Sequence, residues 1–402
     1  MNYREALAWL YGAQTFGIKL GLENIRRLLE AAGNPQERLR FIHVAGTNGK
    51  GSTCAMLDAA LRAGGLSCGF YSSPHLVDFR ERIRIGGGMI PEDAVAAGLT
   101  LLRDAARGWD HAPTFFEIAT ALAAWWFARE GAEVVVWETG LGGRLDATNA
   151  VMPLVSVITP VGLDHQQWLG ASLAEIAAEK AGILKPGVPA VSAPQAPDVR
   201  AVLESRAAAS AAPLRFVEEA YGGPVGLAGG HQRWNAALAL AALDAAGLVR
   251  DEAARRAGLA SVEWPGRFQR IGSDLVIDGA HNPQAAEALV ETWREVFGPK
   301  RARLIFGALR DKDASALLRR LREIADEVWL TTVANPRAVP SGELRALAED
   351  AGFVCVREAG VAQALAAARA AGGPALVAGS LFLAGEALAA LEGRTAPAVS
   401  AQ

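Results

Sequence analysis

The stretch that decides the fold is FIHVAGTNGKGST, residues 41–53. An apolar, partly β-branched run leads into three glycines, and a helix-forming sequence follows from about Ser52. This order is typical of a strand, a phosphate-binding turn and a helix, because glycine lets main-chain N–H groups approach phosphate oxygens. The commonest phosphate loop instead has a glycine where Val44 stands and a hydroxyl residue where Gly51 stands. The stretch therefore predicts either a different kind of ATP site or a plain turn.

Similar units continue along the chain and predict an α/β fold. Short apolar runs alternate with alanine-rich helical stretches, as in parallel βα units. The candidate strands before residue 194 are FIHVAG, SCGFYSS, EVVVWETG, VSVITPVG and VPAVSA. A helical stretch then ends near Gly247, and a Pro- and Gly-containing segment, SVEWPGRFQRIGSD, separates it from a second set: LVIDGAHNP, RLIFGAL, EVWLTTV, FVCV and PALVAGSLF.

Two domains follow from this pattern. We expect an N-terminal, P-loop-type ATPase domain with a mostly parallel sheet over residues 1–264 and a linker over 265–270. A smaller, Rossmann-like α/β domain would then occupy residues 271–402. The terminal letters GRTAPAVSAQ are expected to form a frayed tail.

Composition narrows the class of partner. The formal charge of −3 gives no basic field for nucleic acid or an anionic membrane, so small molecules are favoured. Three cysteines without a CxxC pair argue against disulfides and structural zinc. The longest apolar run is too short to cross a bilayer, and the start does not have the pattern of a signal peptide. A cytoplasmic protein is expected.

Polar residues at the ends of candidate strands suggest ligands for a metal ion. Glu138 ends the VVVW run, and His165 follows the VSVITPVG run. Ligands of open parallel sheets bind at the carboxyl ends of the strands, so Glu138 is either a magnesium ligand or a solvated carboxylate. By itself, His165 reads more readily as a packed or capping histidine than as a ligand. Lys180, in the helical stretch SLAEIAAEKAGIL, reads by itself as a surface charge.

A nicotinamide-dependent oxidoreductase is disfavoured. Gly140 and Gly142 begin a partial dinucleotide fingerprint, but its third glycine position holds Leu145. A leucine there would prevent the close packing of helix on strand that the fingerprint needs.

Taken together, the motifs resemble a known family. Over residues 41–283 the chain carries HVAGTNGKGS, YSSPHLVDFRERI, TFFEIAT, ETGLGGRLDATN, LDHQQWLGASLAEIAAEKAGILKPG, HQRWNAALAL, PGRFQR and DGAHNP, in that order. This series is similar to the signatures of the folylpolyglutamate synthase and dihydrofolate synthase family, the folate branch of the Mur ligases. The glycine turn is then this family's own version of a phosphate loop.

The resemblance implies a role for each matching position. ATP would contact Gly49, Lys50, Gly51 and Ser52, together with Asn235 and Arg267 near the interdomain link and Asp278 at the end of the first strand of the second domain. Magnesium would be held by Ser73, Glu138 and His165. Lys180 would be carbamylated and, with Lys50 and His165, would form the catalytic set. The pterin site would be lined by Thr114, Phe115, Phe116 and Glu117 and by Leu145, Asp146 and Ala147, although core packing is the alternative for the two phenylalanines.

The implied activity is ATP-dependent addition of L-glutamate to dihydropteroate and to reduced folates through an acyl phosphate, with ATP and Mg2+ as cofactors and a monomeric chain. Elongation of the glutamate tail alone is one alternative. A cell-wall Mur ligase is disfavoured, because only about 40 residues precede the loop, too few for the extra domain of those enzymes. A nucleotide-dependent switch that forms no bond is a third possibility.

Overall fold

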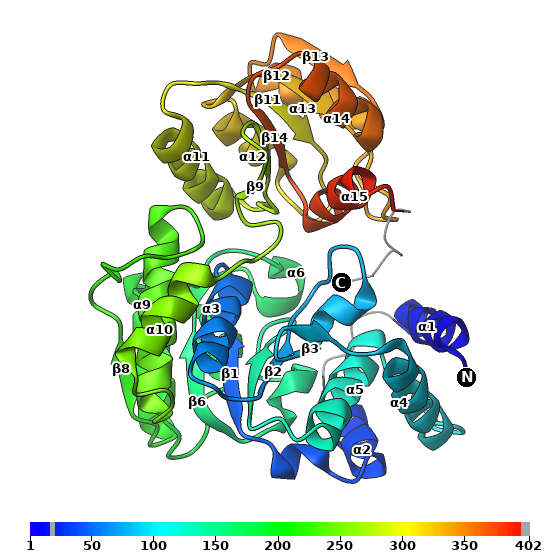
Figure 1. Cartoon of the computed structure of the whole chain (residues 1–402), viewed down its shortest axis with the longest axis vertical. Coiled ribbons are helices and arrows are strands. Elements are labelled where there is room, and N and C mark those ends of the chain that lie inside the picture. Colours follow the sequence, from blue (N-terminus) through cyan, green and yellow to red (C-terminus); the bar gives the residue numbers. More distant parts are fainter. Residues whose placement is uncertain (17–20, 395–402) are drawn as a thin grey trace.

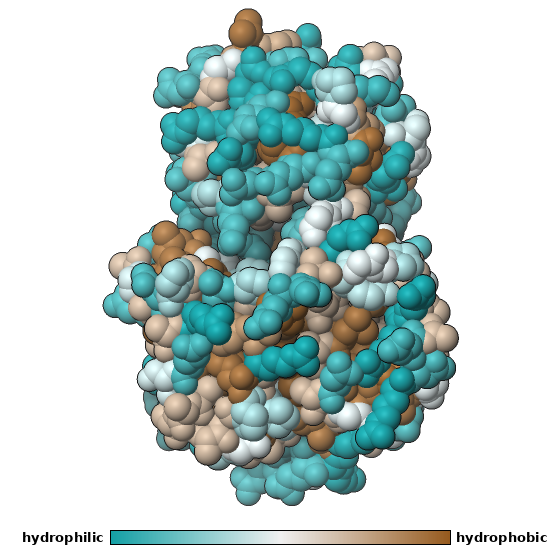
Figure 2. Space-filling view, turned by 90° about the vertical axis from the view of Figure 1, so that its left-hand side faces the viewer, coloured by the Kyte–Doolittle hydropathy of each residue, from teal (hydrophilic) through white to brown (hydrophobic). Residues whose placement is uncertain are grey.

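The computed structural model describes residues 1–16 and 21–394. Nearly all of the predicted frayed tail, residues 395–402, lies outside the described residues. The chain forms two α/β domains, one above the other, with a narrower waist between them (Figures 1 and 2). Each domain is built on one sheet, of eight strands in the first domain and six in the second. The two-domain, mostly parallel α/β prediction is confirmed.

The first sheet has the order β4-β3-β2-β5-β1-β6-β7-β8. Strands β1, β2 and β5 to β8 are parallel, whereas β3 and β4 add an antiparallel edge. The central strands are apolar because helices cover both of their faces. The strands are β1 Phe41–Ala45, β2 Cys68–Tyr71, β3 Ile83–Ile85, β4 Gly88–Met89, β5 Val134–Glu138, β6 Pro153–Ile158, β7 Ala190–Ser192 and β8 Leu214–Phe216.

Helices cover the two faces of this sheet in separate groups (Figure 1). One core joins β-strand side chains to α3, α9 and α10, and the opposite core joins them to α1, α2, α4 and α5. A third cluster lies under α7 and α8. The helices are α1 Tyr3–Gly12, α2 Glu23–Ala31, α3 Lys50–Ala63, α4 Glu92–Ala105, α5 Phe115–Arg129, α6 Gln166–Leu169, α7 Leu173–Ala181, α8 Pro197–Ala209, α9 Gly230–Ala245 and α10 Glu252–Ser261.

The second sheet has the order β13-β12-β11-β14-β10-β9, with only β9 antiparallel. Helices α11 to α13 pack on one face and α14 and α15 on the other. The strands are β9 Gln269–Ile271, β10 Leu275–Ile277, β11 Ala302–Phe306, β12 Ala325–Leu330, β13 Cys355–Glu358 and β14 Ala375–Ala378. The helices are α11 Pro283–Phe297, α12 Ala314–Leu321, α13 Ser341–Asp350, α14 Val361–Ala370 and α15 Leu381–Leu391.

One strand prediction is longer than the strand it describes. The segment PALVAGSLF was expected to be extended throughout, but the strand ends at Ala378 and α15 begins at Leu381. The side chain of Ser380 accepts a hydrogen bond from the Phe382 N–H, so the serine caps the helix. The two apolar residues after it belong to the helix.

The passage between the domains runs from the end of α10 to the start of β9. Strand β9 begins at Gln269, inside the stretch predicted as the linker, and the exact boundary stays a prediction. None of the helices in the described residues has the length and apolar character needed to cross a bilayer.

Candidate active site

Residues 46–49 form a turn, here called the glycine loop, between β1 and α3. Gly46 has a φ of 148° and Gly49 a φ of 86°, angles that residues with a side chain rarely adopt. A Cβ added to Gly46 would lie 1.8 Å from Oγ1 of Thr159, at the end of β6, and one on Gly49 would lie 2.6 Å from Oδ1 of Asn235. Helix α3 begins at Lys50, two residues earlier than predicted, so its N-terminus directly follows the loop.

Two lysines meet at one carbonyl group of this loop. Nζ of Lys50 donates to the Gly46 carbonyl at 3.0 Å and to the Thr47 carbonyl at 3.2 Å. Nζ of Lys180, from α7, donates to the same Gly46 oxygen at 2.9 Å. Lys180 is only 4% exposed, so it is not the surface charge that its local sequence suggests. Burial, aided by the charge of Lys50, lowers the pKa of Lys180 to about 7, and a large share of it is therefore neutral near neutral pH.

Glu138 ends β5 inside the protein rather than in solvent. Its carboxylate accepts a hydrogen bond from the Ser73 N–H at 3.2 Å. Burial raises its pKa, and the charge of Lys50 opposes this rise. A buried carboxylate next to a hydroxyl residue supplies the oxygen ligands that Mg2+ prefers. Within the described residues no three His, Cys, Asp or Glu side chains lie close enough to hold a metal by themselves.

His165 and Asp164 lie in the turn after β6. His165 has a φ of 52° and occupies the position before the first residue of α6. Burial lowers the pKa of His165 to about 4, with Asp164 opposing and Lys312 assisting the shift. The imidazole is therefore neutral at physiological pH, as a metal ligand must be. Burial raises the pKa of Asp164, but the hydrogen bond from His281 and the positive charge of Lys312 outweigh this effect and hold the pKa well below its usual range.

The TFFE segment begins α5 with a capping box. The Thr114 N–H donates to Glu117 at 2.7 Å, and the Glu117 N–H donates back to Oγ1 of Thr114 at 3.3 Å. Phe115 is buried, with ring centroids 5.5 Å from Tyr11 and 6.1 Å from Phe79. Phe116 is only half-buried, and its ring would lie 2.5 Å from a Cβ on Gly140. Of the two phenylalanines, Phe116 is thus the one with surface left for a ligand.

Asp146, between Leu145 and the buried Ala147, holds its own loop in shape. Its carboxylate accepts from the Leu141 N–H at 2.8 Å and from the Thr148 N–H and hydroxyl at 3.0 and 2.5 Å. Burial raises the pKa of Asp146. The Gly140 N–H also donates to this carboxylate, so these bonds use about four acceptor positions.

His43 is a buried residue that the sequence reading passed over. Its Nε2 lies 2.9 Å from Oγ1 of Thr148 and 3.0 Å from Oγ1 of Thr139. Because the Thr148 hydroxyl donates to Asp146, His43 helps to hold the Asp146 loop on strand β1. The only signal in the sequence is a lone histidine within an otherwise apolar strand.

The remaining ATP-site candidates come together from both domains. Asn235, on α9, donates to Gln232, which donates to the Ser52 hydroxyl at 3.3 Å. Asp278 follows β10 and accepts from the N–H groups of Phe268 and Ala280, both at 2.7 Å. A cavity of about 40 Å³ has Gly51, Ser73, Glu138 and Arg267 in its wall, together with Ser72, Pro74, Leu76, Glu81, Arg84, Trp264, Pro265 and Leu381. Predicted phosphate, metal and interdomain residues thus share one space.

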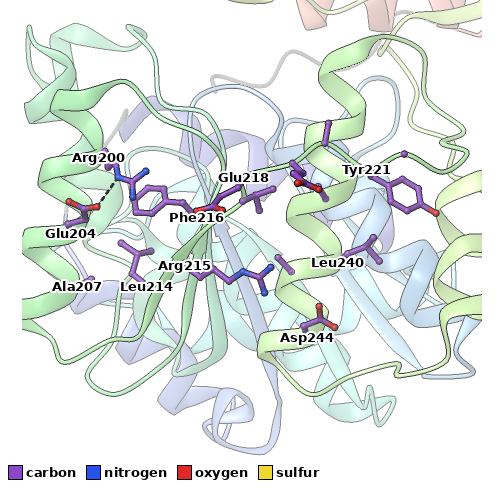
Figure 3. A pocket seen from close by; sticks show the side chains of 16 residues that line it. Arg200, Glu204, Ala207, Leu214, Arg215, Phe216, Glu218, Tyr221, Leu240 and Asp244 are labelled. Atoms are coloured by element: carbon purple, nitrogen blue, oxygen red, sulfur yellow. Dashed lines mark hydrogen bonds and ion pairs between the residues drawn. The ribbon is translucent and has the colours of Figure 1, made fainter.

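A larger cavity, of about 850 Å³, lies away from these residues. It runs along the edge strand β8 between α8 and α9, and Figure 3 shows Arg200, Phe216 and Asp244 among the residues around it. Arg200 is paired with Glu204 at 2.8 Å and lies over the Phe216 ring. No residue of the predicted site lines this cavity.

Comparison with known proteins identifies the family. Residues 266–381 match the model of the Mur ligase glutamate ligase domain. The dihydrofolate synthase/folylpolyglutamate synthase of Bacillus subtilis is 37% identical over 374 residues, which cover 84% of this chain and 86% of that protein. The chain belongs to the dihydrofolate synthase/folylpolyglutamate synthase family. The resemblance seen in the motifs is thereby confirmed.

Solved structures of the family agree over the whole fold. FolC of Escherichia coli, in complex with DHPP and ADP, is 34% identical, with a TM-score of 0.87 over 96% of this chain and 98% of that chain. The bifunctional enzyme of Yersinia pestis, complexed with AMPPNP and a manganese ion, gives the same identity and TM-score over 98% of each chain. Members of this family therefore bind ATP-type nucleotides, a divalent metal and DHPP on this fold.

Proposed function

We propose that this chain is an ATP-dependent ligase that adds L-glutamate to dihydropteroate and to reduced folates and their polyglutamates, through an acyl-phosphate intermediate. The observation that carries this proposal is the cavity between the domains, where Gly51, Ser73, Glu138 and Arg267 share one wall. Gly51 in this wall directly follows Lys50, and Arg267 adds a second cation; phosphoryl transfer depends mainly on such positioning and charge neutralisation.

The residues at this site divide into three sets. The phosphates of ATP would lie against the N-terminus of α3, in contact with Gly49, Lys50, Gly51 and Ser52. Asn235, which lies beside Gly49, would contact the nucleotide together with Arg267 and Asp278. Mg2+ would be held by Ser73, Glu138 and His165 and, when bound, would neutralise phosphate charge. Carbamylation of Lys180 is part of the proposal, because its partly neutral amine can react with carbon dioxide to give an anion beside the metal site.

The chemistry transfers the γ-phosphoryl group of ATP to a carboxylate of the folate substrate. The amino group of glutamate then attacks the acyl phosphate, and ADP and phosphate leave. A carboxylate and a triphosphate repel each other, so the positive charge of Lys50 would neutralise part of their negative charge as the two approach. Its hydrogen bonds to the Gly46 and Thr47 carbonyls hold the ammonium against the glycine loop.

The pterin ring would lie near Phe116 and Asp146, in the site that residues 114–117 and 145–147 were predicted to line. The half-buried Phe116 ring can stack on a flat heterocycle, and the Asp146 carboxylate, which holds its own loop in shape, would accept from a ring N–H. Thr114 and Glu117 would act by fixing the start of α5 rather than by contact. Activity on dihydropteroate as well as on reduced folates, in a monomeric cytoplasmic chain independent of nucleic acid and membrane, completes the proposal.

Omission of single substrates tests the proposal directly. The chain is incubated with ATP, Mg2+, glutamate and either dihydropteroate or tetrahydrofolate, and the products are weighed by mass spectrometry while ADP release is followed. We expect ADP release only when acceptor and glutamate are both present, and products heavier by one or more glutamyl units. ADP release without either substrate would instead indicate a nucleotide switch, and ligation of tetrahydrofolate alone would indicate tail elongation only.

A further inference from the structure

The two domains meet at the glycine loop itself. From the second domain, the contact is made by Asn282 and Gln284, at the start of α11, and by Lys312, in the turn after β11. From the first domain it is made by the glycine loop and by the turn that follows β6. The loop that would hold the phosphates is thus also a surface on which the second domain docks.

The two contacting parts of the first domain are joined to each other. The N–H groups of Thr47 and Asn48 both donate to the Pro160 carbonyl, at 2.9 and 3.2 Å. The Thr47 hydroxyl donates to the Gly162 carbonyl at 3.0 Å and lies 3.0 Å from the Gly162 N–H. A shift of either segment therefore moves the other.

Asn48 is the glycine-loop side chain that reaches across to the second domain. Its amide N–H group donates to Oε1 of Gln284 at 2.8 Å, and its oxygen accepts from Nδ2 of Asn282 at 3.0 Å. Asn282 is 4% exposed and caps α11 by accepting from the Ala285 N–H, so the orientation of its side chain is fixed by the helix. The Asn48 amide is therefore held by a rigid element of the other domain.

An ion pair holds the same two surfaces together. Nζ of Lys312 lies 2.5 Å from Oδ1 of Asp164, and both side chains are 9% exposed. Nδ2 of Asn282 also approaches Oδ2 of Asp164, at 3.4 Å. The contacts of Asp164 with Lys312 and Asn282 and the contacts of Asn48 with Asn282 and Gln284 therefore join the same two surfaces.

We propose that Asn48 is a positioning residue through which docking of the C-terminal domain fixes the glycine loop for phosphoryl transfer. The inference rests on the proposed function. Glycines at positions 46 and 49 leave the loop backbone little intrinsic stiffness. Hydrogen bonds to α11 supply that stiffness only when the domains are together. The reactive geometry therefore depends on the Asn48 contacts, whereas the proposed contacts of Gly49 to Ser52, Arg267 and Asp278 with the nucleotide do not involve Asn48.

The test compares three variants of the full chain. Asn48→Ala removes both amide contacts, Gln284→Ala removes one, and the double variant completes a cycle. Gln284 is exposed and outside the proposed catalytic set. Glu291→Ala, an exposed position about two turns further along α11, is the matched control. For each variant, kcat for ligation is measured together with the Kd for Mg2+–AMPPNP and the hydrogen exchange of residues 46–49.

We expect Asn48→Ala to lower kcat about tenfold, because it loses the hydrogen bonds to both Asn282 and Gln284, and Gln284→Ala to lower it about threefold, because it loses only one of them. The double variant should be no slower than Asn48→Ala, the Kd should change less than about twofold, and exchange in the loop should rise. Glu291→Ala should match the unmodified chain.

The proposal is overturned if Asn48→Ala keeps kcat within about twofold of the unmodified chain. It is also overturned if the two single effects multiply in the double variant, because Asn48 and Gln284 would then act independently. A loss in Kd alone would overturn it too, because the contact would then serve nucleotide binding and not phosphoryl transfer. Failure of the proposed function would be recognised by a different result, because the unmodified chain itself would not ligate glutamate. Loop exchange in Asn48→Ala would still report on the docking contact in that case.

Discussion

At the residue scale, the glycine loop was readable from the sequence and the lysine behind it was not. Gly49 and Lys50 lie next to each other in a local pattern whose chemistry is carried by the backbone. Lys180 acquires its character from Gly46, 134 positions earlier in the chain, and from burial that only the folded sheet provides. Without the family resemblance, its sequence neighbourhood indicates an ordinary surface lysine.

Replacement of Lys50 tests the charge at the loop. We predict that Lys50→Ala lowers glutamate ligation by about 100- to 1000-fold, the usual cost of removing one group that stabilises developing charge. The fold should survive, because within the part of the chain that the structure describes the Lys50 ammonium donates only to the loop carbonyls of Gly46 and Thr47. Ligation rates and circular dichroism melting curves provide the measurement, with the exposed Lys300→Ala as control. Near-normal turnover in Lys50→Ala would rule out the loop assignment.

His43 gives stability a pH dependence. Burial lowers the pKa of His43 to about 3 from 6.5, so the folded protein holds it neutral. The stabilisation is complete above pH 6.5 and is lost as the pH falls toward 3, because the unfolded chain then binds a proton that the folded chain does not. Between pH 6.5 and 5 this amounts to about 2 kcal/mol.

Urea unfolding of the unmodified chain and of His43→Gln across this range measures the effect. We expect the free energy of unfolding of the variant to depend less steeply on pH by about that amount. Equal slopes in the two proteins would mean that His43 is protonated in the folded state.

At the element scale, the long central strands and alanine-rich helices were predicted and the short edges were missed. Strands β3, β4, β8 and β9 have two or three residues each, and pairing with a neighbour rather than their own pattern makes them extended. The start of α5 shows a related effect. Thr114 and Glu117 look like a substrate motif in the family, yet in the structure they also form the capping box that begins the helix.

The contact between α3 and α10 depends on a glycine. A Cβ on Gly258 would lie 2.6 Å from the Ala60 Cα and 2.7 Å from the Ala59 carbonyl oxygen, both backbone atoms of α3. We predict that Gly258→Ala lowers the free energy of unfolding by about 1 to 3 kcal/mol, because the helices must move apart. Gly342→Ala is the matched control: the glycine is helical and has nothing within 4 Å, so alanine should be neutral or stabilising by up to about 1 kcal/mol. Equal effects in urea unfolding would contradict the packing explanation.

At the scale of the whole molecule, two domains with separate cores face each other across the proposed nucleotide site. The fold class was predictable because the βα alternation restarts after residue 274. The pairs that join the domains, such as Asn48 with Gln284 and Asp164 with Lys312, were not predictable, since they connect positions 236 and 148 residues apart. Only the folded arrangement brings them into contact.

Nucleotide and metal should stabilise the molecule together. We predict that the Mg2+–AMPPNP complex, at about 100 times its Kd, raises the free energy of unfolding by about 2.7 kcal/mol. Chelation of the metal with EDTA should remove most of this gain, because the phosphates would then face the buried Glu138 carboxylate uncompensated. Calorimetric unfolding with and without EDTA measures it. In Glu138→Gln the response to Mg2+ should be weak, and a full response would exclude Glu138 as a metal ligand.

The edge strand β8 of the first sheet affects how readily the protein associates at high concentration. Strand β8 has three residues, Pro213 stands immediately before it, and a charged Arg215 occupies its middle. A second chain trying to extend the sheet there would find few free donors and would have to accommodate a guanidinium group. This border is consequently a poor template for fibrous growth, and high protein concentrations should be reachable without sheet-to-sheet association at this site.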